Sequence, residues 1–484
     1  MQVKQQHEAP FSDSRVQMIN HCGLKLSRKI GLIEGIGLVT GGVIGMGVYS
    51  LIPSIVREAG SGAWLAITVA LIISVIGVLP LIQIASAMPV AGGGYFYCSR
   101  LLHPLLGTIV SFLAIIGGSS SVCVVLIGLG EFISPYLSSK ISLHVLAMLM
   151  LGGFILLNQF GLRVVTWLQL VLSAQLVLSL LLYAAGIGWF KEVHYTFTFP
   201  GNTGGFIMAV ILSLNVCLGF QIIAELGEEI RHARRNIPLS LFLGGIVILI
   251  IYLVVTLSYT SVTVQEGEAF HRKEAALLET ARMYLPNGLV LFILLGAVSA
   301  GLTSLNAAAI ALPREFYAQA RDHIITPWFS HIHKNTGTPL RAVNAFFTVV
   351  FLLLTAGMLL DTSGALSSQF KKAIDFYAYM AVCGIMSLTV FVSIAAFRLP
   401  GKYPALYNKA YLRLPRTLLF TAIVISVVTA LGLIIILFME SALIMSLYLG
   451  LMAVVIVYYY LRSAWLARQG KYMGQIYRFE DKEI

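Results

Sequence analysis

Charged residues are scarce in this chain of 484 residues. Only 11% of the residues are Asp, Glu, Lys or Arg, and 58% are hydrophobic, which gives a mean hydropathy of +0.88. An average soluble domain carries about 25% charged residues. The composition therefore excludes a soluble globular protein and predicts an integral membrane protein.

Cysteine is also rare, and the chain has no Ser/Pro-rich linker and no low-complexity tract. The five cysteines show neither metal-ligand spacing nor an extracellular pair, so we expect no disulfide framework, no metal site and no cofactor. The polar residues 1–29 lack a small-residue cleavage site, so no cleavable signal peptide is expected. Membrane acyltransferases and proteases need His, Asp or paired Ser and His groups at one depth. No such set is present, and an enzyme is not expected.

Long apolar runs dominate the sequence instead. Most of them reach the roughly 20 residues that a helix needs to cross a bilayer. Twelve spans are predicted, at 31–56, 62–88, 105–133, 142–160, 164–189, 205–227, 239–260, 287–311, 341–360, 374–397, 417–438 and 441–461.

The net charge of +11 reflects orientation in the membrane. With a cytoplasmic N-terminus, the inner segments hold 24 of the 32 Lys and Arg residues and the outer loops hold eight. The positive-inside rule then places both termini in the cytoplasm, and we expect the cell membrane as the location. The basic balance does not indicate a nucleic-acid partner.

Two spans contain residues that interrupt a helix. Four of the ten residues from Gly41 to Ser50 (GGVIGMGVYS) are glycine, and Asn215 and Gly219 lie within the sixth span. Glycine and asparagine weaken a helix locally, and an open backbone persists in a membrane only where it lines a protein cavity. Broken helices are a binding device of secondary transporters. A glycine-rich face for close helix packing is the alternative.

The two interrupted spans are five apart, which is typical of two inverted five-helix halves. In this region the sequence also resembles a known family. GGVIGMGVYSLIP, MPVAGGGYFYCSR, LGFQIIAELGEEIRHARRNIP and REFYAQARDHIITPWFSHIHKNTGTP are similar, in order, to four motifs of the amino acid–polyamine–organocation (APC) transporters. The resemblance covers roughly residues 31 to 341.

The resemblance implies an all-α membrane protein of twelve helices with a LeuT-like fold. It divides the chain into a cytoplasmic tail (1–29), a first five-helix repeat (30–189), a second repeat (204–398), two peripheral helices (415–463) and a cytoplasmic C-terminal tail (464–484). The implied function is secondary transport of amino acids by alternating access, as an antiporter or a symporter. Its partners would be the amino acid, the lipid bilayer and a co- or counter-transported solute or ion.

The family pattern also implies which residues bind the substrate. Its carboxylate would meet the amides of Gly45, Met46 and Gly47. Its ammonium would meet the carbonyls of Val43, Asn215 and Leu218. Phe220 and Tyr49 could wall or gate the pocket. A polyamine or other organocation transporter, an amino-acid sensor and, less well supported, a channel are the alternatives.

Residues that could couple transport to a proton or sodium gradient are harder to identify. Gln175 and Gln221 stand where relatives often carry a lysine and a glutamate. We expect the charge of Glu225 to be paired at the basic inner surface, so that transport depends weakly on a pH gradient. Thr303 and Ser304 could offer hydroxyls to a sodium ion, although such hydroxyls more often bond their own helix.

The polar connections carry three further predictions. Residues 88–100 should form a re-entrant turn at the inner mouth. The charged residues from Glu228 to Arg235 should either anchor the topology or pair within an inner gate. Residues 261–284 should contain an amphipathic helix over the outer surface, as a lid or a simple connector.

Overall fold

A computed structural model describes residues 26–134, 142–190, 202–263, 276–363, 373–474 and 476. These residues form helices and no strand; two isolated bridges join Ile30 to Ile230 and Ala91 to Leu226. The first half contains α1 (Leu32–Val43), α2 (Gly47–Ala59), η2 (Gly60–Gly62), α3 (Ala63–Ala87), α4 (Gly93–Leu101), α5 (Pro104–Ile133), α6 (Leu143–Gln159) and α7 (Leu162–Phe190).

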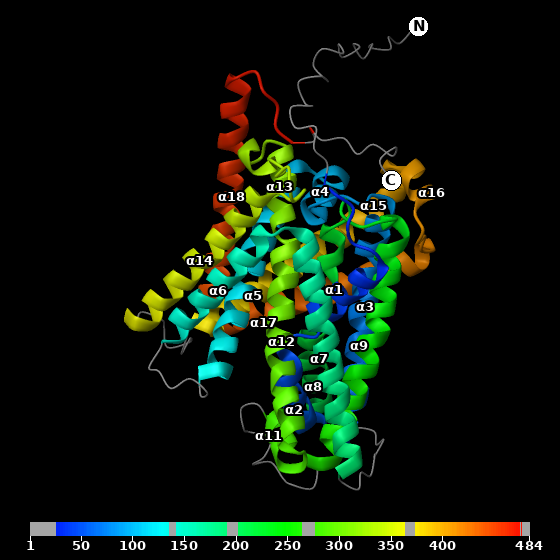
Figure 1. The fold of residues 1–484 in the computed structure, drawn as a ribbon. Coiled ribbons are helices and arrows are strands. Elements are labelled where there is room, and N and C mark those ends of the chain that lie inside the picture. Colours follow the sequence, from blue (N-terminus) through cyan, green and yellow to red (C-terminus); the bar gives the residue numbers. More distant parts are fainter. Residues whose placement is uncertain are drawn as a thin grey trace.

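The rest of the chain continues in the same helical pattern. It contains α8 (Thr203–Val216), η4 (Phe220–Glu225), α9 (Ala233–Thr263), α11 (Ala276–Tyr284), α12 (Asn287–Ala311), α13 (Pro313–Arg321), η5 (Pro327–Ser330), α14 (Leu340–Ser363), α15 (Ala373–Lys402), α16 (Pro404–Lys409), α17 (Arg416–Glu440) and α18 (Ala442–Arg468). Figure 1 shows α4, α13 and α16 at one end of the molecule and α2 and α11 at the other.

Ten helical segments in the described part of the chain are long and apolar enough to cross a membrane. Two shorter apolar helices, Leu32–Val43 and Leu143–Gln159, lie within the predicted first and fourth spans. The first of these is short because the helix breaks after Val43. The chain is thus a multi-pass membrane protein, as the composition predicts.

Helices from the two halves pack against one another. α15 lies along α5, α12 lies along α7, and α1 packs on α9. In α5, 72% of the most apolar window is buried within the protein, whereas in α18 only 17% is. α5 is therefore central, and α18 presents most of its surface outward, as a peripheral helix does.

Candidate functional site

The first interruption lies between α1 and α2. The α1 helix ends at Val43, and Ile44 has a ψ of 82°, which is outside the helical range. The Gly45 amide donates to the Val43 carbonyl at 2.9 Å, so the chain folds back tightly before α2 begins at Gly47. No described group accepts a hydrogen bond from the amides of Met46 and Gly47. Two N–H groups at the start of α2 are thus available to an anion.

The second interruption lies between α8 and η4, directly against the first. Gly219 has a φ of 119°, which side chains disfavour. A Cβ at Gly219 would lie 2.6 Å from the carbonyl oxygen of Gly42. The glycine therefore serves two purposes, since it permits the turn and lets the two open backbones touch.

Tyr252 of α9 holds the two interruptions together. Its buried hydroxyl lies 2.8 Å from the carbonyl oxygen of Val216 and 3.4 Å from that of Val43, to which it can donate. Both carbonyls belong to residues where a helix ends, so they lack an intrahelical partner. Sequence analysis did not single out Tyr252. The signal for it in the sequence was weak, because the same span carries several other hydroxyl side chains, although a buried tyrosine hydroxyl needs a partner.

Small and polar groups surround the first interruption. Oγ of Ser304 lies 2.8 Å from the position that a Cβ at Gly45 would occupy, whereas a Cβ at Gly47 would meet nothing closer than 3.7 Å. The Met46 sulfur lies near Gly128 of α5. The α5 and α12 helices therefore face this interruption, and a Cβ at Gly47 would make only ordinary van der Waals contacts.

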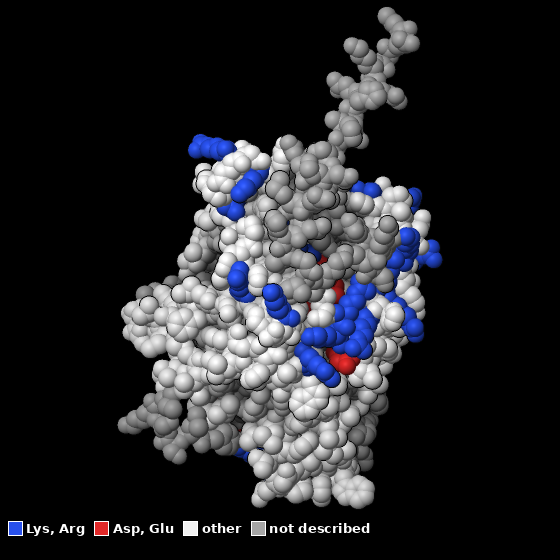
Figure 2. All heavy atoms as spheres, turned by 45° about the horizontal axis from the view of Figure 1, so that its top comes forward, with Lys and Arg blue, Asp and Glu red and all other residues white. Residues whose placement is uncertain are grey.

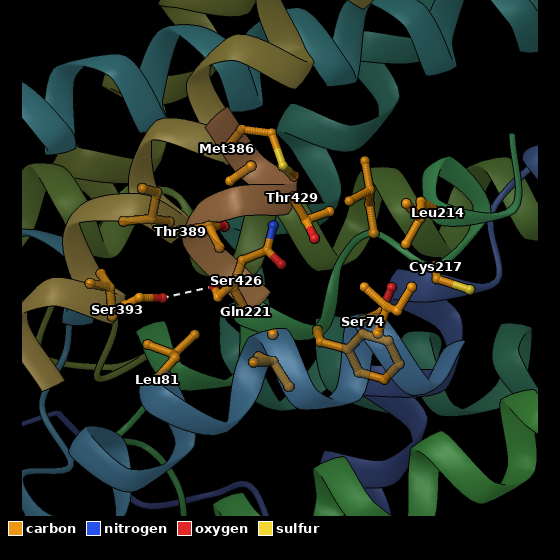
Figure 3. Close-up of a pocket in the computed structure, with 18 of the residues that line it drawn as sticks. Ser74, Leu81, Leu214, Cys217, Gln221, Met386, Thr389, Ser393, Ser426 and Thr429 are labelled. Atoms are coloured by element: carbon orange, nitrogen blue, oxygen red, sulfur yellow. Dashed lines mark hydrogen bonds between the residues drawn. The ribbon is translucent and has the colours of Figure 1, made fainter. Parts of the chain in front are cut away.

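Not all of the predicted binding residues gather at this place. Leu218, Phe220 and Gln221 line a separate cavity of about 90 Å³, whose walls come from α3, α15 and α17. Figure 3 shows Gln221 in this cavity with Thr389 and Thr429, beside the Ser393–Ser426 hydrogen bond of 2.8 Å. No residue of α1 or α2 lines this cavity. These three residues thus border a cavity that is separate from the first interruption.

Each of the remaining candidate side chains has a hydrogen-bond partner of its own. The Asn215 side chain donates to Ile211 of its own helix at 3.1 Å, and Gln175 donates to the Phe292 carbonyl at 3.3 Å. The Tyr49 hydroxyl lies 3.3 Å from Oγ of Ser179 in α7.

The sodium candidates have partners within their own helix. The hydroxyls of Thr303 and Ser304 both donate to the Ala300 carbonyl, at 3.0 and 3.1 Å. This is the ordinary role of a hydroxyl in a span. A sodium ion would have to compete with these hydrogen bonds or share the oxygen lone pairs.

At the end of the molecule that holds α4 and α13, the structure corrects one expectation. Glu225 was expected to be paired at the basic surface, but it is only 4% exposed and forms no ion pair among the described residues. Its Oε1 accepts a hydrogen bond of 3.1 Å from the amide of Gly94, at the start of α4. The fold buries Glu225 because α4 re-enters the protein and covers η4.

The segment 88–100, predicted as a turn, turns only over residues 88–92, and residues 93–100 belong to the helix α4. Gly92 has a φ of 68°, and a Cβ there would lie 2.4 Å from both Ala318 and the Arg314 carbonyl oxygen of α13. α4 therefore fits closely against both η4 and α13, which explains the need for several glycines.

Charged pairs join α13 to the segment after η4. Glu229 and Arg314 are 0% and 2% exposed and form two hydrogen bonds, of 2.8 and 3.0 Å. Glu228 and Arg321 form a second pair at 2.9 Å. The two glutamates thus pair with arginines of α13 rather than with the neighbouring arginines, and a role in an inner gate stays a prediction. Figure 2 shows Lys and Arg side chains gathered at this end of the molecule.

At the opposite end, α11 confirms the predicted amphipathic helix. It packs on α2, α7 and α12, and its Thr280 hydroxyl lies 2.8 Å from that of Tyr183. Leu277 and Ala281 on its inner face are fully buried. The short helix therefore covers the outer ends of three longer ones.

Comparisons with known proteins agree with these features. An uncharacterised transporter of Mycobacterium tuberculosis is 26% identical over 357 residues, which cover 73% of this chain and 79% of the relative. The branched-chain amino acid permease of Bacillus subtilis is 23% identical over 404 residues, covering 79% and 83%. The vacuolar cationic amino acid transporter 8 of Arabidopsis thaliana is 25% identical over 369 residues, covering 72% and 60%.

The sequence profile described as amino acid permease matches residues 30–461, which is most of the chain. The profile and the relatives indicate membrane transport of amino acids, as a transporter rather than an enzyme. The chain belongs to the amino acid permease family, within the APC transporters.

Proposed function

We propose that this protein is a secondary transporter that binds one amino acid between its two interrupted helices and moves it by alternating access. The observation that carries the proposal is the pair of unbonded amides at Met46 and Gly47, next to a second open backbone at Gly219. A helix N-terminus attracts an anion through these amides and through its dipole. The substrate carboxylate is the anion that fits this position.

The ammonium of the substrate needs carbonyl oxygens. The Val43 carbonyl already accepts a hydrogen bond from the Gly45 amide and lies within reach of the Tyr252 hydroxyl. We therefore place the ammonium mainly on the carbonyls of Asn215 and Leu218, and Val43 contributes when one of its hydrogen bonds opens. An ammonium left without such partners in a low-dielectric site would be strongly unfavourable.

The surroundings favour a substrate with an uncharged side chain. The polar side chains described around Gly41 and Gly45 are neutral, namely Ser173, Gln169 and Ser304. A cationic side chain would need a carboxylate there. Recognition through the main chain would explain why relatives are named for branched-chain and for cationic amino acids.

Alternating access requires that one end of the site be closed while the other opens. The inner end is closed by the two ion pairs between α13 and the segment after η4. We propose that this is the cytoplasmic end. Both termini would then lie in the cytoplasm, and the protein would lie in the cell membrane. The concentration of Lys and Arg at this end supports the assignment.

Uptake of labelled amino acids into liposomes tests the proposal, with Gly47→Leu as the diagnostic variant. A Cβ at Gly47 would meet no atom closer than 3.7 Å, so we expect the variant to fold, and the rest of the leucine side chain would crowd the free amide. Loss of one hydrogen bond to a charged group, about 1.5–3 kcal/mol, predicts an affinity roughly 10- to 100-fold lower. Gly432→Leu is the matched control, because no atom lies within 4 Å of that position in α17.

Four other results would contradict the proposal. Normal substrate affinity in a well-folded Gly47→Leu protein would exclude the amide site. Uptake that never saturates would indicate a channel. Binding without flux would indicate a sensor, and preference for polyamines over amino acids would indicate an organocation transporter.

A further inference from the structure

Glu225 of η4 and Glu315 of α13 form a buried pair of acidic side chains at the inner end of the molecule. They are 4% and 1% exposed, and both carboxyl groups bind the first turn of α4. Glu225 accepts from the amide of Gly94 at 3.1 Å, and Glu315 accepts from that of Tyr95 at 3.2 Å. The two carboxyl groups meet at Gly94, where a Cβ would lie 2.7 Å from Oε1 of Glu315 and 3.4 Å from Oε1 of Glu225, so a proton on one group would let it donate to the other.

The hydrogen bonds differ between the two partners. Both oxygens of Glu315 receive a donor, since Oε1 accepts from Tyr95 and Oε2 from the hydroxyl of Ser111. Oε2 of Glu225 is buried and no donor reaches it. A carboxylate oxygen without a donor is unfavourable in a buried site. The charge therefore belongs on Glu315, and the proton belongs on Oε2 of Glu225.

The other charged groups around the pair form ion pairs with one another. Arg314 pairs with Glu229, Arg321 pairs with Glu228, and Arg100 of α4 pairs with Asp322. None of these cations forms an ion pair with Glu225 or Glu315. The titratable groups of α4 next to the pair are Tyr97 and Cys98, and burial raises the pKa of both far above neutral pH. Gln319 of α13 adds a neutral donor to Ser111 at 2.7 Å.

We propose that Glu225 and Glu315 form a proton-binding site that couples proton release on the inner side to the opening of that side. With one proton, the pair joins η4 to α13 and both to α4. Without it, two carboxylates would share a buried site with too few donors and would repel each other. Separation of η4 from α13 would then open the inner end.

The proposal rests on the transport function proposed above and goes beyond it. It also replaces the expectation that transport depends weakly on pH, because that expectation assumed a basic partner for Glu225. Because the pair would give up its proton on the inner side, an inward proton gradient would drive net uptake. Exchange of one amino acid for another also requires the inner end to open, so the proton would leave and return on the inner side.

Glu225→Gln is the diagnostic variant. The glutamine oxygen can still accept from Gly94, and its NH₂ can donate to Glu315, so the variant resembles a permanently protonated Glu225. In liposomes, we expect both net uptake driven by an inward proton gradient and counterflow exchange at equal pH to fall at least about tenfold, because glutamine has no proton to release and the inner end stays closed. Glu34→Gln is the matched control: Glu34 caps the Gly31 amide at 3.0 Å in α1 and lies outside the pair.

A second measurement does not depend on transport. Infrared difference spectra of the purified protein should show a protonated carboxyl band at neutral pH that disappears in Glu225→Gln and persists in Glu34→Gln. An unchanged band, or wild-type proton-driven uptake in Glu225→Gln, would overturn the proton site. Absence of both uptake and exchange in the wild type at every pH would instead overturn the transport function, so the two failures are distinguishable.

Discussion

At the scale of single residues, the conformation of Gly219 determines how the two interruptions meet. The Gly219→Ala variant should be destabilised, because its Cβ would lie 2.6 Å from a backbone oxygen at a φ of 119°. Backbone strain alone costs on the order of 1–3 kcal/mol. Melting temperatures in detergent, compared with Gly245→Ala, test this. At Gly245 the nearest atom is 3.8 Å away, so alanine should be neutral or stabilising. Equal melting temperatures for the two variants would show that an alanine at position 219 causes no backbone strain.

The sequence predicted part of the site at this scale. The glycines at 41–47 and the Asn–Gly pattern of the sixth span indicated both interruptions, because few other residues weaken a helix so clearly. It could not show that Phe220 and Gln221 face a separate cavity, since this depends on the rotation of η4 after the break. The role of Glu315 was also hidden, because a glutamate in a polar connection gives no sign of its burial.

At the scale of elements, the Glu229–Arg314 pair ties the segment after η4 to α13. Arg314→Met should leave Glu229 buried without a partner and lower stability by about 3–5 kcal/mol. The double variant Glu229→Leu with Arg314→Met removes both charges and should recover much of the loss. Thermal unfolding of the three proteins measures this. If the double variant is no more stable than the single one, the pair does not act as a unit.

The exposed pair of Glu279 and Arg282 on α11 provides the contrast. Their side chains are 34% and 46% exposed, and the distance between them is 3.2 Å. Because water screens such a pair, Glu279→Gln should change stability by less than about 1 kcal/mol. The buried pair with two hydrogen bonds and the exposed pair with one contact should thus differ several-fold in their effect on stability.

At the scale of the whole molecule, apolar runs predicted where the helices lie but not which of them are central. The α15 and α18 windows have the same mean hydropathy of 2.2, yet 67% of the first and 17% of the second is buried. Lipid and protein interior are similarly apolar, so hydropathy does not distinguish them. The arrangement depends on small residues that allow close approach. Gly384 of α15, for example, would place a Cβ 2.5 Å from the Leu113 carbonyl of α5.

Orientation in the membrane is a prediction for the whole chain, and labelling of single cysteines tests it. The described cysteines are buried, so a Cys22→Ser background should react little with an impermeant maleimide. Met283 in α11 and Tyr472 after α18 are 55% and 77% exposed, at opposite ends of the molecule. In intact cells Met283→Cys should be labelled, whereas Tyr472→Cys should react only after permeabilisation, because the arginine-rich end faces the cytoplasm. Labelling of Tyr472→Cys in intact cells would reverse the orientation. The Glu225–Glu315 pair would then release its proton outward, and a proton gradient would drive export instead of uptake.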